Sequence, residues 1–237
     1  MERTSYFDEN YIYPQANGVK LINGGWDETQ SKVYIFKRCQ EWMKEYMGED
    51  DIRALGITET GIESNDPDIN SVWYGSMMGE FMKHNLEFFI PWSWKTGMWE
   101  TLHLFARYNK EYYLPSTSGN DSIVSVHTSI SADKDSMSIL LINRSIKDEI
   151  ETEIQLKNYE VSDGEYRLSQ LSDLPEEETF ISHAINALKE KSVMVQNGKA
   201  TITLPPLSTS TLQLCKTEQT ELDEQKNPIL RVYPTYT

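Results

Sequence analysis

The chain has only two cysteines among its 237 residues, Cys39 and Cys215. Their wide separation fits neither a metal-ligand motif nor a disulfide scaffold. No apolar run reaches the roughly 18 residues that a transmembrane helix needs. The N-terminal stretch MERTSYFDENYIYP lacks the apolar core of a secretory signal. A formal net charge of −15 makes nucleic acid and anionic membrane surfaces unfavourable partners.

Several motifs that mark familiar chemistries are also missing. The sequence contains no GxGxxG, no P-loop, no GxSxG, no HExxH and no CxxC, so it gives no sign of nucleotide, serine-hydrolase or metal chemistry. The four histidines are scattered along the chain and are expected to be structural or on the surface. Carboxylates and aromatic side chains are the remaining candidates for function.

The first half of the chain alternates strand-like and helix-like segments. Strands are predicted at 18–24, 52–58 and 86–94, and helices at 27–47, 66–85 and 97–112. Short connections between such units indicate parallel strands with right-handed crossovers, in either a (β/α)8 barrel or a doubly wound sheet. The helix faces expected in the core are Val33, Phe36, Cys39, Met43 and Met47; Ile69, Val72, Trp73, Met77 and Phe81; and Trp99, Leu102, Phe105 and Ala106.

The pattern changes after Tyr113 to short strands separated by turn residues. Asn197-Gly198 between two alternating strands predicts a hairpin with a type I′ turn. A short helix is predicted in ISHAINALKEK, residues 181–191. The fold class is therefore α/β plus all-β, with domains at 1–113 (α/β) and 114–216 (an antiparallel β-sandwich). Residues 217–237 form a polar tail with a possible terminal strand, which has no predicted place in the fold.

Functional side chains of parallel α/β folds gather at the C-terminal ends of the strands. That rule selects Trp26 after the first strand, Glu59 and Glu63 after the second, and Trp92 and Trp94 after the third. A carboxylate flanked by indoles suits a sugar, because carboxylates stabilise an oxocarbenium ion and indoles stack on sugar rings. Each residue also has a plainer interpretation. The two glutamates would be solvated surface acids, and the indoles would be core residues.

Four stretches carry a resemblance to a known family. LGITETG, FFIPWSW and WETLHLFARYN resemble the last strands and helices of a retaining (β/α)8-barrel glycoside hydrolase, and ATITLPPLSTSTLQL is similar to the β-sandwich that follows such barrels. The nearest types are endoglucanase family 44-like and agarase/porphyranase-like enzymes. The resemblance implies the last three βα units of a barrel, a polysaccharide substrate, an extracellular or periplasmic location and no cofactor. It assigns Glu59 as the nucleophile and Trp26, Trp92 and Trp94 as sugar platforms, with Glu63 as a further substrate contact.

The sequence departs from this family pattern in one respect. A retaining glycosidase needs two carboxyl groups about 5–5.5 Å apart, and the family's acid/base glutamate follows an asparagine at the end of the fourth strand. No such Asn-Glu pair precedes Glu59. We therefore expect the C-terminal part of a longer hydrolase, with the nucleophile but without the acid/base. The open edges of its parallel strands would be covered by the sandwich, by the missing barrel half or by a second copy of the chain.

Two other interpretations stay open at the level of sequence. The chain could be a non-catalytic carbohydrate-binding or scaffold fragment that keeps the indole platforms but turns nothing over. It could also be an unrelated α/β domain with a sandwich, in which Glu59 is a solvated acid. A cleft between Glu59 and the indoles would favour the glycan interpretations over this last one.

Overall fold

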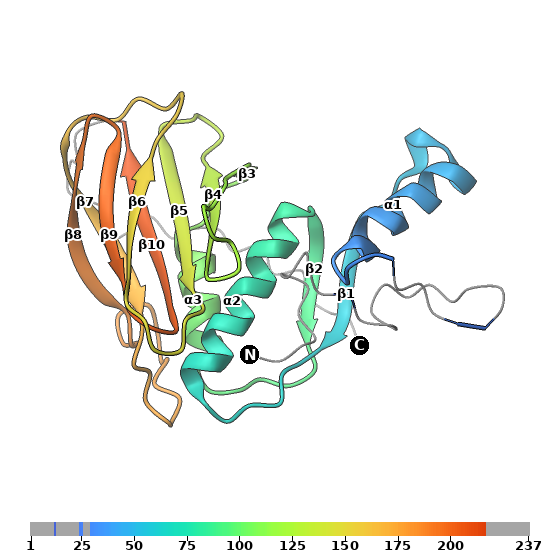
Figure 1. The fold of residues 1–237 in the computed structure, drawn as a ribbon, viewed down its shortest axis with the longest axis horizontal. Coiled ribbons are helices and arrows are strands. Elements are labelled where there is room, and N and C mark those ends of the chain that lie inside the picture. Colours follow the sequence, from blue (N-terminus) through green and yellow to red (C-terminus); the bar gives the residue numbers. More distant parts are fainter. Residues whose placement is uncertain (1–11, 13–23, 26–28, 217–237) are drawn as a thin grey trace.

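The computed structural model describes residues 12, 24–25 and 29–216. It contains a small parallel sheet, a large antiparallel sheet and a helix layer between them (Figure 1). The predicted strand at 18–24 lies outside the described residues except for Gly24. The helices are α1 (Tyr34–Met47), the short η1 (Glu49–Asp51), α2 (Pro67–Lys83) and α3 (Met98–Tyr108).

The small sheet consists of β1 (Leu55–Thr60) and β2 (Leu86–Pro91), which pair in parallel. Helix α2 connects the two strands, so this part of the chain is one β-α-β unit followed by α3. The parallel pairing agrees with the α/β prediction for the first half. Two strands do not close a barrel, and the barrel inferred from the resemblance remains a prediction.

Helix α2 begins where the sequence places an acid before a proline. The Asp66 carboxylate accepts hydrogen bonds from the backbone N–H groups of Asp68 (3.0 Å) and Ile69 (3.1 Å). Pro67 occupies the first helical position, where its missing N–H costs nothing. The N-terminal start of this helix is therefore fixed by local chemistry alone.

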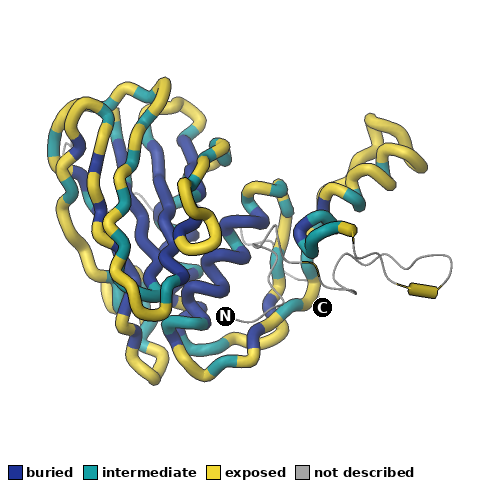
Figure 2. Tube along the Cα trace, viewed as in Figure 1, coloured by how far each residue is buried: buried dark blue, intermediate teal, exposed yellow. Residues whose placement is uncertain are grey.

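Most of α2 is buried, because it lies between the two sheets (Figure 2). One side contacts the small sheet through Trp73, Tyr74 and Met77, in a cluster that includes residues of β1 and β2. The side toward the large sheet carries Gly75 and Gly79, whose missing side chains let the backbone approach that sheet closely. A helix buried on both sides cannot show a single apolar stripe in its sequence.

The large sheet has eight strands in the order β3-β4-β5-β10-β7-β8-β9-β6. It is one continuous hydrogen-bonded sheet rather than two, but it curls so that β9 lies against β5 and β10 and encloses one core, as a sandwich does. The predicted hairpin is confirmed, since Asn197 and Gly198 both have positive φ angles between β8 and β9. The strands are β3 (Tyr112–Leu114), β4 (Val124–Ile130), β5 (Ser136–Asn143), β6 (Ile150–Gln155), β7 (Gly164–Leu171), β8 (Lys189–Gln196), β9 (Lys199–Leu204) and β10 (Ser208–Cys215).

The predicted helix at 181–191 is wrong. These residues form the end of the β7–β8 connection and the beginning of β8. The Asn186 side chain donates hydrogen bonds to the backbone carbonyls of Ser182 (3.0 Å) and His183 (2.8 Å), which stabilises a turn instead. From Lys189 onward the chain pairs with β7. We call residues 172–188 the insert.

The face of the small sheet that points away from α2 is exposed. Phe88, Ile90 and Trp92 alternate along β2 and its end, with exposed fractions of 47%, 49% and 72%. Parallel strands normally have both faces covered. Covering of the exposed face of the small sheet by a barrel half or a second copy stays a prediction.

Helix α1 is buried only at its beginning, at Val33 and Phe36. Met47 is 49% exposed, although its spacing predicted a core position.

The close approach of α2 to the large sheet can be tested at Gly79. A Cβ added there would lie 2.3 Å from the His127 ring on β4. We expect Gly79→Ala to lower the free energy of unfolding by about 1–2 kcal/mol, because overpacking outweighs the better helix propensity of alanine. Urea unfolding measures the change. Gly119→Ala is the control, since nothing lies within 4 Å of its added Cβ; equal midpoints for the two variants would contradict this packing.

His127 also makes stability depend on pH. Burial lowers the pKa of His127 to about 4, with Arg144 and Lys83 acting in the same direction and Glu80 opposing them. The folded-state pKa is thus below the unfolded value of about 6.5, so the contribution to stability is complete above pH 6.5 and is lost as the pH falls toward 4. In urea unfolding at pH 7 and pH 5, we expect His127→Gln to remove about 2 kcal/mol of the wild-type pH dependence. Parallel pH profiles for the two proteins would contradict this.

Candidate functional site

Glu59 lies near the C-terminal end of β1, as the sequence predicts, and is exposed. The end of β2 lies beside it, because the Trp92 backbone N–H donates to the Thr60 carbonyl oxygen at 2.7 Å. The Cβ atom of Trp92 is 3.5 Å from the place where a Cβ of Gly61 would be. The structure therefore brings Trp92 to the strand end that carries Glu59. Glu63 is exposed in the loop that follows β1.

Trp94 belongs to an aromatic cluster that sequence reasoning found only in part. Its ring stacks on Trp99, with centroids 4.0 Å apart and planes 9° apart. A second aromatic neighbour is Tyr74 of α2, at 5.6 Å and in edge contact. Trp99 was predicted to be a core residue of its helix, and that is wrong, since it is 40% exposed. The stack with Trp94, rather than the helix core, holds its side chain.

The beginning of α2 supports the loop between β2 and α3, which comprises residues 92–97. The Asn70 side-chain amide donates to the Thr96 carbonyl at 3.1 Å. Gly97 has a φ of 90°, and an added Cβ would lie 2.4 Å from the Pro67 carbonyl oxygen. This position requires glycine for both its conformation and its space. The two indoles of the loop are therefore presented by a rigid support.

The insert of the large sheet also forms hydrogen bonds with the beginning of α3. Glu178 accepts a hydrogen bond from the Gly97 N–H at 3.3 Å. The buried Glu100 carboxylate accepts from the Thr179 hydroxyl at 2.9 Å and from the Ala187 N–H at 3.0 Å. Burial raises the pKa of Glu100, and the hydrogen bonds from Thr179 and Ala187 act against that rise. The two glutamates therefore hold the insert and the loop together.

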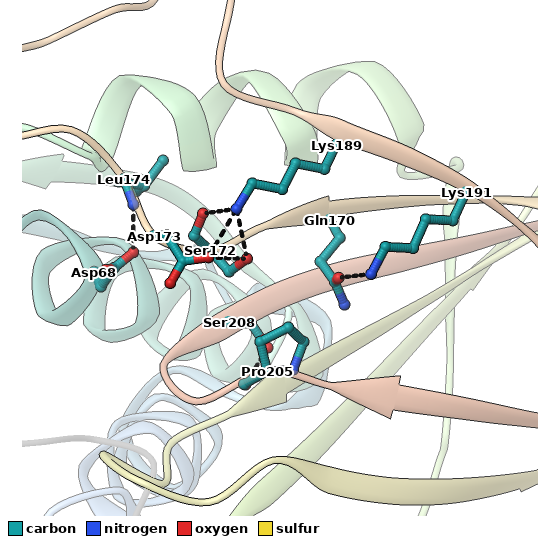
Figure 3. A network of polar contacts seen from close by, with 9 residues as sticks. All are labelled: Asp68, Gln170, Ser172, Asp173, Leu174, Lys189, Lys191, Pro205 and Ser208. Atoms are coloured by element: carbon teal, nitrogen blue, oxygen red, sulfur yellow. Dashed lines mark hydrogen bonds and ion pairs between the residues drawn. The ribbon is translucent and has the colours of Figure 1, made fainter.

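The beginning of the insert is held by a further polar network (Figure 3). Asp68 of α2 accepts from the Leu174 N–H at 3.0 Å. The Lys189 ammonium donates to the Ser172 carbonyl at 2.7 Å and pairs with Asp173 at 2.9 Å. Desolvation raises the pKa of Asp68, and its hydrogen bond from Leu174 opposes that effect. Elements more than a hundred residues apart in sequence are thus joined beside the strand ends.

These contacts place four of the five predicted site residues, which are Glu59, Glu63, Trp92 and Trp94, on or beside the ends of the parallel strands. Trp26 lies outside the described residues. The roles assigned to all five stay predictions. The sequence did not identify four further residues of this region, because only the tertiary structure brings them to the strand ends. They are Tyr74, Trp99, Glu100 and Glu178. In the described ranges, no group of three or more His, Cys, Asp or Glu side chains is placed to hold a metal ion.

An exposed carboxylate at one strand end, with Trp92 at the end of the neighbouring strand, on a β-α-β unit joined to a curled antiparallel sheet, is the arrangement expected from the resemblance to glycoside hydrolases. Comparison with solved structures confirms that resemblance at the level of the fold. The chain is similar to a bifunctional glucanase-xylanase from a metagenome library, with 19% identity and a TM-score of 0.67 over 91% of this chain and 38% of that one. It is also similar to a family 44 endoglucanase from Clostridium thermocellum, with 13% identity and a TM-score of 0.69 over 90% and 40%.

A third similar structure is a family 44 xyloglucanase from Paenibacillus polymyxa, with 14% identity and a TM-score of 0.66 over 77% of this chain and 36% of that one. The chain thus spans between 36% and 40% of the length of these three structures. No family model matches the sequence, and no curated protein matches it. Within the part of the chain that the structure describes, none of the helices is long and apolar enough to cross a membrane.

The connection between the insert and α3 can be tested by hydrogen exchange. Glu100→Ala removes the acceptor of the Thr179 hydroxyl and the Ala187 N–H. We expect peptides that cover residues 178–188 to exchange at least tenfold faster, while peptides from β5 and β10 keep their protection. Glu176→Ala, an exposed acid of the same insert, is the control. Unchanged exchange at Ala187 in Glu100→Ala would show that these hydrogen bonds do not hold the insert.

Proposed function

We propose that this chain carries part of the site of a retaining endo-β-glycanase and acts on or binds a polysaccharide. The observation that supports this most is the position of Glu59, which is exposed at the C-terminal end of a parallel strand whose neighbour continues into Trp92. The fold that surrounds this pair is one that solved glucanases and xyloglucanases share.

In this proposal Glu59 is the nucleophile. Its carboxylate attacks the anomeric carbon and forms a glycosyl-enzyme, while an acid protonates the departing oxygen; water then hydrolyses the intermediate with help from the same second group. The chain supplies Glu59, and no Asn-Glu strand end precedes it in this sequence. A second carboxyl from outside this chain completes the pair.

The indoles bind the sugar rings. Trp92 is 72% exposed and its backbone binds Thr60, the residue after Glu59, so in this proposal it offers a flat apolar surface at the reacting ring. Trp94 is 39% exposed and is held by its stack on Trp99, so it suits a neighbouring ring. Trp26 and Glu63 are further contacts in this proposal. An extracellular or periplasmic location follows from family resemblance and remains a prediction.

The test uses a substrate that does not need the absent acid. A 2,4-dinitrophenyl β-cellobioside has a leaving group that departs without protonation, so Glu59 alone can form the glycosyl-enzyme. We expect the full chain to release dinitrophenol, and we expect the rate of release to be at least 100-fold lower in Glu59→Gln. Glu87→Gln, an exposed acid near the other end of β2, is the matched control and keeps the wild-type rate.

Binding is measured in parallel on glucan, xyloglucan and xylan oligosaccharides. Trp92→Ala should weaken the affinity about tenfold, because it removes the exposed platform. Equal rates for wild type and Glu59→Gln would contradict the assignment of the nucleophile. Binding without any release of dinitrophenol would favour the second candidate, a non-catalytic carbohydrate-binding fragment, which the same exposed indoles support. Absence of both binding and turnover would contradict both.

A further inference from the structure

The insert brings an additional aromatic side chain next to the candidate site. Phe180 contacts His103 of α3, with ring centroids 5.0 Å apart. His103 lies four residues after Trp99, so the two side chains share one face of the helix. Trp99 in turn stacks on Trp94 at 4.0 Å. One face of α3 thus carries two ring pairs, Trp94–Trp99 and His103–Phe180; we call Trp99, His103 and Phe180 the aromatic ridge.

The ridge is apolar rather than cationic. Burial, with smaller effects from Arg107 and His183, lowers the pKa of His103 to about 4, so its imidazole is neutral near pH 7. Both its ring nitrogens are buried without a hydrogen-bond partner among the described residues. His103 therefore packs as a neutral ring against Phe180, and Trp99 and Phe180 are the partly exposed members of the ridge.

The position of Phe180 is fixed by several independent contacts. Its backbone N–H donates to the Glu178 carboxylate at 3.2 Å, and the other oxygen of that carboxylate accepts from the Gly97 N–H. The neighbouring residue Thr179 donates to Glu100 at 2.9 Å. A ring held in this way loses little conformational entropy when a ligand stacks on it. The nearby carboxylate of Glu178 is also an acceptor for hydroxyl groups.

We propose that the aromatic ridge is an additional sugar-binding subsite, which the insert of the large sheet adds to the site at Glu59. Its ligand is a sugar ring of a glycan chain long enough to pass from Trp92 over Trp94 to Phe180. This rests on the proposed function and extends it. The large sheet then takes part in substrate binding, and the chain selects long glycans over short ones.

The experiment compares oligosaccharides of two lengths by titration calorimetry. The wild-type full chain is titrated with β-glucan oligosaccharides of three and six units. We expect Phe180→Ala to weaken binding of the six-unit glycan about tenfold and that of the three-unit glycan less than twofold. Phe180→Leu keeps an apolar side chain against His103 but removes the flat ring, and we expect the same selective loss. Ile181→Ala, a 74% exposed neighbour, is the control and should change neither affinity.

Two outcomes would overturn the subsite. If the Phe180 variants and wild type show the same preference for the longer glycan, while Trp92→Ala weakens both lengths, the ridge only packs the insert on α3 and the proposed function stands. If wild type binds neither length, the proposed function fails and the subsite fails with it. Thermal unfolding of each variant separates these results from loss of the fold, because Phe180→Leu should unfold within a few degrees of wild type.

Discussion

The burial of α2 between two sheets is the constraint on which the rest of the structure depends. Gly75 and Gly79 let its backbone approach the large antiparallel sheet, while Trp73 and Met77 fill the space toward β1 and β2. A Cβ at Gly79 would overlap the His127 ring of the large sheet, so a larger residue there would push the helix away from that sheet and into the core beside β1 and β2. Since β1 and β2 have few other described contacts with the large sheet, α2 sets where the strand ends lie (Figure 1).

That position explains how the candidate site is assembled. The first turn of α2 supports the loop that carries Trp92 and Trp94, through Asn70 and through the close contact of Pro67 with Gly97. The insert of the large sheet reaches the same place. Asp68 and Glu100 accept hydrogen bonds from backbone and hydroxyl groups of the insert, and Glu178 of the insert accepts one from a backbone N–H of the loop. Three segments distant in sequence thus converge at one rim, and none of them would hold the indoles in place by itself.

The sequence predicted what local chemistry controls. The helix predicted at 66–85 corresponds to α2, Asn197-Gly198 identified the hairpin, and Glu59 and Trp92 were found at strand ends. The predictions from the sequence failed where long-range contacts determine the structure. Trp99 has the spacing of a core residue, yet its stack with Trp94 leaves it at the surface. Residues 181–191 have a helix-like composition, but the turn at Asn186, the acceptor Glu100 and, from Lys189 onward, pairing with β7 keep them out of a helix. The curl that makes one sheet look like a sandwich is likewise a property of long-range pairing.

The central claim is that Glu59 is a nucleophile presented to a sugar, and covalent labelling tests it most directly. The full chain is incubated with 2,4-dinitrophenyl 2-deoxy-2-fluoro-β-cellobioside, whose good leaving group departs without an acid and whose fluorine slows hydrolysis of the glycosyl-enzyme. Peptide mass spectrometry then locates the adduct. The account predicts one fluoroglycosyl group on Glu59 and none in Glu59→Gln. An adduct on another residue, or an unlabelled protein after complete exposure to the reagent, would contradict it.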